Sequence, residues 1–124
     1  RDKTMTKTHK ALQTGPLERL YNGAAPAKIL DFLLVFRDFD YSKQDIAKNS
    51  NVSFRHTLRE LEKLEKLGLV KQTRTVGHSK MFKLNIENPA VGFLEKFATE
   101  LAYRECLNVE AEQGKQMATV AQTV

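Results

Sequence analysis

The chain has 124 residues, of which 41% are hydrophobic, and a net charge of +5, which suits one compact domain with a single core. It contains no apolar run of about 18 residues, so no membrane-spanning helix is expected, and its one cysteine, Cys106, excludes a disulfide within these residues and fits a reducing cytoplasm. The three histidines have no metal-ligand spacing with one another or with Cys106, so neither a metal site nor a cofactor is expected.

The charged residues are unevenly distributed along the chain. Residues 69–83 contain four basic residues and no acidic one, and residues 1–15 contain four basic residues and one acidic one. Residues 84–124 contain six acidic residues and three basic ones. A local concentration of positive charge favours a polyanionic partner, although many solvated surfaces are also basic.

The first third of the chain predicts a tail and two helices. Residues 1–15, rich in lysine and threonine, are expected to form a mobile basic tail, and residues 16–21 suit a short helix. Residues 25–38 suit a longer helix, since Pro26 fits the first turn and the apolar residues leave little polar face. A helix of this kind is expected at the centre of the core, with Phe36 buried.

The next two predicted helices are separated by a short polar break. Residues 41–49 suit a helix with Ser42 as N-cap and Asp45 in the capping-box position three residues later. Ser53 is then expected to cap a further helix, which Gly68 ends.

This further helix, residues 53–67, has one apolar stripe. Hydrophobic residues recur every three or four positions, the spacing of a helix face that packs into a core. The stripe consists of Phe54, Leu58, Leu61, Leu64 and Leu67. With Phe54, Leu58 and Leu61 buried, Arg55, His56 and Arg59 are expected on the open side of the helix.

A hairpin with a basic tip is predicted to follow. Residues 69–76 and 80–86 suit two strands, and the second has the alternating pattern of a half-buried strand. The turn between them is Gly77-His78-Ser79.

The last predicted helix covers residues 90–112 and begins after Asn88-Pro89. Its apolar face is larger than so small a domain is expected to cover, and it contains Val91, Leu94, Phe97 and Leu101. Residues 114–124 are small, polar and unpatterned, and they are expected to fray.

The order of these elements and one long segment together resemble a known family. The segment SKQDIAKNSNVSFRHTLRELEKLEKLGLVKQTRTVGHSKMFKL, residues 42–84, resembles the winged helix-turn-helix domains of MarR-like and ArsR-like prokaryotic transcription regulators. Its most specific part is IAKNSNVS with LEKLGLV, followed by the wing TRTVGHSKMFKL. The resemblance implies an α+β, mostly helical fold. A DNA-binding domain would span residues 16–88, and a C-terminal dimerisation helix would span residues 89–113.

The resemblance also implies that residues 53–67 are the recognition helix, which enters the major groove, and that residues 74–80 are the wing, which meets flanking backbone or the minor groove. Arginine can pair with guanine through two hydrogen bonds, and short polar side chains suit phosphates or base edges. The predicted DNA-binding residues are Ser42, Lys43, Asn51, Ser53, Arg55, His56, Thr57, Arg59, Lys63, Arg74, His78, Ser79 and Lys80.

Three functions are compatible with the sequence. The first is a cytoplasmic, nucleoid-associated regulator that binds double-stranded DNA sequence-specifically as a homodimer, with Val91, Leu94, Phe97 and Leu101 in the dimer interface. The second is a winged helix that binds proteins, or an architectural one that binds DNA without sequence choice. The third is a regulator that senses a small molecule or redox state, with a pocket between the central and C-terminal helices. An enzyme is not expected, because no Gly-rich phosphate loop, nucleophile elbow or metal-binding His-Glu motif occurs.

Overall fold

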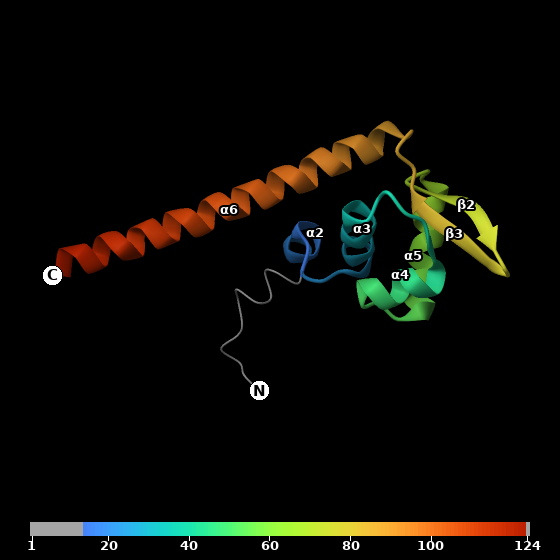
Figure 1. The fold of residues 1–124 in the computed structure, drawn as a ribbon, viewed down its shortest axis with the longest axis horizontal. Helices are drawn as coiled ribbons and strands as arrows, with labels where there is room; N and C mark the ends of the chain where they lie inside the picture. The colour runs from blue at the N-terminus through green and yellow to red at the C-terminus, as the bar shows by residue number, and fades with distance from the viewer. Residues whose placement is uncertain (1–13, 124) are drawn as a thin grey trace.

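A computed structural model describes residues 14–123, so the predicted basic tail, apart from its last two residues, lies outside the described part. The fold is α+β and mostly helical, as predicted, with a small sheet at one end (Figure 1). In chain order its elements are α2 (Pro16–Leu20), α3 (Ala25–Val35), β1 (Tyr41–Ser42), α4 (Lys43–Ser50), α5 (Phe54–Lys66), β2 (Val70–Val76), β3 (Ser79–Leu84) and α6 (Pro89–Thr123).

The sheet has three antiparallel strands in the order β1-β3-β2. The hairpin of β2 and β3 is the predicted one, but β1 was predicted as the start of a helix. In β1, Tyr41 pairs with Phe82, and Ser42 pairs with Met81. Since β1 is two residues long and its partner lies far along the chain, no local sequence pattern predicts it.

Side-chain caps set the boundaries of α4 and α5, and they confirm the predicted ones. The Ser42 hydroxyl accepts a hydrogen bond from the Asp45 N–H at 3.2 Å, and the Ser53 hydroxyl accepts one from the His56 N–H at 3.2 Å. Between the helices, Asn51 has a φ of 59°, a left-handed conformation that asparagine tolerates.

The main core lies between α3, α4, α5 and the inner face of the sheet. It is built from Ile29, Phe32, Leu33, Ile46, Leu61, Leu64, Val70, Phe82, Leu84 and Val91. The helix α3 is central, as predicted, but its C-terminal end is not. Val35 is exposed and Phe36 is 48% exposed, so the prediction that Phe36 is buried is wrong. The reason is that α3 ends at Val35, at the margin of the core.

A second, smaller cluster attaches α6 to α2 and α3. Its buried residues are Leu17, Ala27 and Ala98, and Leu30, Leu34, Leu94 and Leu101 pack against them. On the same side, Arg19 of α2 pairs with Glu105 of α6 at 2.6 Å. The first half of α6 is therefore held against the domain by both apolar and ionic contacts.

The helix α6 is longer than predicted. It has 35 residues and continues through Gly114 to Thr123, so the predicted end near residue 112 and the frayed segment after it are wrong. A glycine inside a helix costs only about 1 kcal/mol relative to alanine, and no proline follows it to force an end. The C-terminal half of α6 extends well beyond the rest of the domain (Figure 1). None of the described helices is long and apolar enough to cross a membrane.

Candidate nucleic-acid interface

The helix α5 presents a polar face to solvent, but it is rotated relative to the prediction. Phe54 is 45% exposed and Leu58 is 36% exposed, so the predicted burial of these two residues is wrong. Leu67, the last residue of the predicted apolar stripe, is exposed as well. The inward face consists of Thr57, Glu60, Leu61 and Leu64. A threonine and a glutamate occupy positions in this face, and residue type alone does not predict that.

Thr57 was predicted to contact DNA, and the structure contradicts this. Its side chain is 0% exposed and its hydroxyl has no hydrogen-bond partner among the described residues. A fully buried hydroxyl cannot reach a phosphate or a base edge. Thr57 is instead part of the packing between α5 and the core.

Arg55, His56 and Arg59 are exposed on α5, as expected, and Asn51 and Ser53 are exposed just before it. The hydroxyl of Ser53 accepts the capping hydrogen bond, and its own O–H is still available as a donor. The first turn of α5 therefore presents hydrogen-bond donors to solvent.

Glu60 lies close to two of the predicted DNA-binding residues of α5. Its Oε2 lies 3.4 Å from His56 Nε2 and 3.5 Å from Lys63 Nζ. The Glu60 side chain is nearly buried, so the nearby Lys63 ammonium group compensates a charge that would otherwise be costly there. The side chains of His56 and Lys63 both remain exposed.

Arg74, which was predicted to contact DNA from the wing, forms an ion pair with another residue of the chain. Its Nε and Nη2 donate to the two carboxylate oxygens of Asp40 at 2.9 and 3.1 Å, and the Thr73 hydroxyl donates to the same carboxylate at 2.5 Å. These hydrogen bonds lower the pKa of Asp40 to about 2, and the one from Arg74 has a larger effect than the one from Thr73. Sequence analysis did not identify Asp40 as the partner, because the two residues are far apart in the chain.

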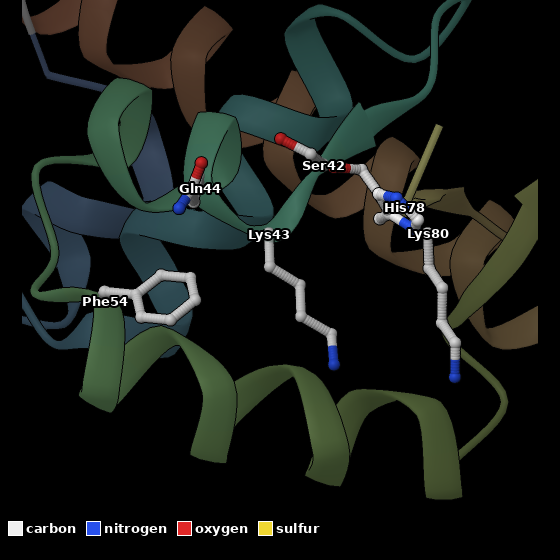
Figure 2. Close-up of a pocket in the computed structure, with 7 residues that line it drawn as sticks. Ser42, Lys43, Gln44, Phe54, His78 and Lys80 are labelled. Atoms are coloured by element: carbon white, nitrogen blue, oxygen red, sulfur yellow. The ribbon is translucent and has the colours of Figure 1, made fainter. Parts of the chain in front are cut away.

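A groove lies between the start of α4, the start of α5 and the tip of the β2–β3 hairpin. Its volume is about 330 Å³, and it is lined by Ser42, Lys43, Gln44, Phe54, His78, Ser79 and Lys80. We call it the wing groove. The side chains of Lys43 and Lys80 both extend toward α5, and the ring of Phe54 lies at the start of that helix (Figure 2). No acidic residue lines the groove, so it suits an anion.

The wing groove brings together five residues that sequence analysis predicted separately: Ser42, Lys43, His78, Ser79 and Lys80. The Lys43 ammonium group makes a cation–π contact with the Phe82 ring, and 5.3 Å separate Lys43 Nζ from the ring centroid. Sequence analysis missed Gln44, for which no pattern gave a signal, and Phe54, which was assigned to the apolar stripe.

The residues predicted for a dimer interface separate into two groups. Val91 is 3% exposed and lies in the main core, so its predicted place in a dimer interface is wrong. Leu94 and Leu101 are partly buried against the smaller cluster, and Phe97 is exposed. Further exposed hydrophobic residues of α6 include Phe93, Tyr103, Leu107 and Val109.

A hollow of about 270 Å³ does lie between α3 and α6, where the sensing alternative places a pocket. Its charged residues already have partners. Arg37 pairs with Glu95, and the Asp31 carboxylate accepts hydrogen bonds from the N–H groups at the start of α2. The hollow therefore presents no unpaired charge that would select a ligand. Among the described residues, no group of three or more His, Cys, Asp or Glu is arranged to hold a metal ion, and Cys106 is exposed.

No family model and no curated protein matches the sequence. Solved structures of similar fold include MepR, a transcription regulator of the Staphylococcus aureus multidrug efflux pump MepA, with a TM-score of 0.62 and 17% identity over 94% of this chain and 88% of that one. NadR in complex with 4-hydroxyphenylacetate has a TM-score of 0.58 and 20% identity over 86% of this chain and 75% of that one. A mutant of Lactococcus lactis ZitR in apo form has a TM-score of 0.54 and 20% identity over 73% and 67%.

These three proteins are MarR-like winged-helix regulators. At 17–20% identity the likeness concerns the fold. The order of α3, α4, α5, the hairpin and a long C-terminal helix agrees with it. The chain therefore has the MarR-like winged helix-turn-helix fold that its sequence predicted.

Proposed function

We propose that this protein is a transcription regulator that binds double-stranded DNA sequence-specifically as a homodimer. The observation that carries the proposal is that the start of α5 adjoins the wing groove, since Phe54, the first residue of α5, lines it. Together they are cationic, and no acidic residue lines the groove. A helix fits the major groove, and a neighbouring basic groove suits the phosphates that flank it.

Arg55 and Arg59 are the proposed base-reading residues. They lie one turn apart on the exposed face of α5, and neither has an ion pair or hydrogen bond to another residue in the described part of the chain. A guanidinium group without an internal partner is free to pair with guanine O6 and N7. Arg74, which Asp40 binds, lacks this freedom.

The wing groove is the proposed phosphate site. Lys43 of α4 and Lys80 of β3 both line it, and Ser42, Ser79 and His78 add shorter polar groups. Contacts to phosphates position a protein on DNA and carry no sequence information themselves. The groove therefore supports affinity, while choice of sequence is assigned to α5.

Dimerisation is proposed through α2 and α6. An apolar groove of about 400 Å³ lies between α2, α3 and α6, lined by Leu17, Tyr21, Ala24, Pro26, Ala27, Leu30, Leu94 and Phe97. Phe93, Tyr103 and Leu107 leave further apolar surface exposed on α6. A second copy is the proposed occupant, because it would supply the complementary α6 and would pair two recognition helices to match a palindromic operator.

Selection of bound sequences from a random DNA pool tests the function. We expect one enriched palindrome, with half-sites about one helical turn, roughly 10 base pairs, apart. Salt-dependent binding without enrichment would favour the architectural alternative. Absence of DNA binding at low salt would favour a winged helix that binds another protein.

A further inference from the structure

Phe54 is an exposed aromatic residue in the middle of a polar surface. It is the first residue of α5, it is 45% exposed, and its ring contributes to neither apolar cluster. The ring lines the wing groove together with Lys43 and Lys80 (Figure 2). Sequence spacing placed Phe54 in the core, so its exposure requires another explanation.

The core does not need this ring. The inward face of α5 is filled by Thr57, Leu61 and Leu64, and Val52, just before the helix, packs against the main core. The backbone at the start of the helix is fixed by the Ser53 cap, whatever side chain follows. A large apolar group at such a position is best explained by a partner that buries it.

Duplex DNA offers few apolar groups to a ring at the start of a recognition helix. The faces of the bases are stacked on one another, and most groups on their edges are hydrogen-bond donors or acceptors. The exception in the major groove is the C5 methyl group of thymine, which apolar side chains can contact. Lys43 and Lys80 beside the ring suit the phosphates next to such a base.

We propose that Phe54 is a specificity-determining residue that reads thymine, by packing its ring against the C5 methyl group of one thymine in each half-site. This inference rests on the proposed function, since it requires α5 in the major groove. It adds an apolar contact to the hydrogen bonds assigned to Arg55 and Arg59. The enriched operator should therefore contain an invariant thymine near its guanines.

The test removes the methyl group from the DNA and the ring from the protein. Each thymine of the enriched half-site is replaced in turn by deoxyuridine, which differs only by that methyl group, and affinity is measured by fluorescence anisotropy. With the native protein, one replacement should weaken binding by about fourfold, the effect of one apolar carbon group returned to water. With Phe54→Ala, the same replacement should have no effect.

Phe39→Ala is the matched control, because Phe39 is an exposed phenylalanine outside the wing groove. Phe39→Ala should keep the full difference in affinity between the thymine duplex and the deoxyuridine duplex. Phe54→Leu, which keeps an apolar side chain, should keep part of it. Circular dichroism verifies that each variant is folded, and the scan with the native protein does not depend on any variant.

The inference is overturned if no thymine replacement weakens binding by the native protein, or if Phe54→Ala keeps the difference. It is also overturned if Phe54→Ala weakens operator and scrambled duplex by the same factor, because the ring would then contact the sugar-phosphate backbone. Failure to bind any DNA would overturn the proposed function as well, whereas sequence-specific binding without a methyl effect overturns only the role of Phe54.

Discussion

Arg74 of β2 and Asp40, the residue before β1, form a two-pronged ion pair that spans the sheet. Their nitrogen–oxygen distances are 2.9 and 3.1 Å. Since β3 lies between β1 and β2, the pair connects the two outer strands directly. The register of β2 is irregular between Gln72 and Thr75, at the two residues that bind Asp40. Such irregularities redirect side chains. Here the side chains of Thr73 and Arg74 both bind Asp40, and we call these contacts the brace of the wing.

This brace predicts a non-additive effect on DNA binding. If Arg74 positions the wing through Asp40, then Arg74→Ala and Asp40→Ala should each weaken binding, and the double variant should be no weaker than either. Anisotropy titrations of the three variants against the operator measure this. If Arg74 contacts DNA directly, Asp40→Ala should instead strengthen binding, because it removes a negative charge and frees the guanidinium.

The same pair predicts acid sensitivity. Asp40 has a folded-state pKa of about 2, against 3.8 for the ordinary carboxyl group, so folding favours its charged form. The pair therefore stabilises the folded state above pH 4 or so, and this contribution is lost as the pH falls toward the folded-state value. Urea unfolding at a series of pH values gives the free energy of unfolding of the native protein and of Asp40→Asn. The difference between these two free energies should become smaller as the pH falls over that range. A constant difference would contradict the assignment.

Asp31 has the opposite pH behaviour and a different role. Its buried carboxylate accepts hydrogen bonds from the N–H groups of Leu17 and Glu18 at 3.1 and 2.7 Å, and so caps α2 from another helix. Burial raises its pKa above the ordinary value, more than these hydrogen bonds lower it. Its contribution to stability should therefore decrease as the pH rises from the ordinary value through the raised one.

Loss of the Asp31 cap should change the free energy of unfolding. Asp31→Ala should lower the free energy of unfolding by about 1 kcal/mol, the usual cost of a lost helix cap. Asp31→Asn keeps one acceptor and should lower it by less. Urea denaturation at neutral pH compares the two. Equal losses would mean that the acceptor kept in Asp31→Asn contributes nothing.

The variants that test the dimer prediction change residues of α6 other than those predicted from the sequence. Leu94 and Leu101 pack within the chain, so charges there would damage the domain itself. Tyr103 and Leu107 lie one turn apart and are exposed. Replacing both with glutamate should produce folded monomers by light scattering, since a buried apolar side chain contributes roughly 1.5–3 kcal/mol. Ile86→Glu, an equally apolar exposed site before α6, should leave the dimer intact. A native protein that is monomeric at high micromolar concentration would contradict the prediction.

The sequence predicted best what local chemistry determines. Ser42, Ser53 and Gly68 each have a cap or turn function that depends on near neighbours, so the ends of α4 and α5 were placed well. It predicted less well what depends on distant contacts. The strand β1 exists only through its pairing with β3. The length of α6 was underestimated for a local reason, because a glycine alone does not end a helix and α6 continues through Gly114.

The residues of the candidate site also divide into those that the local sequence predicts and those whose position depends on packing. Lys43, His78 and Lys80 were predicted from charge near a recognisable motif, and the fold brings them into one groove. Thr57 and Phe54 exchanged their expected places because helical spacing is compatible with two rotations of α5 about its axis. Packing against α3, α4 and the sheet selects between these rotations.

Loss of Arg59 and loss of Lys80 should affect DNA binding in different ways. Arg59 is exposed on the outer face of α5, and losing a two-pronged arginine–guanine contact costs about 1–3 kcal/mol and relaxes choice at that base. Lys80 lines the wing groove, where its expected target is a phosphate. Lys80→Ala should therefore weaken operator and scrambled duplex by a similar factor.

Titrations at two salt concentrations separate the two roles. A dimer that neutralises about 6–8 phosphates should show log K falling with log salt at a slope of about −5 to −7. Lys80→Ala should reduce that slope by about one unit per site and keep the preference for operator, whereas Arg59→Ala should reduce the preference. Lys66→Ala is the control, because Lys66 lies at the far end of α5 and pairs with Glu62. If folded Arg59→Ala keeps the full preference, α5 does not read sequence through this residue, and the architectural alternative gains support.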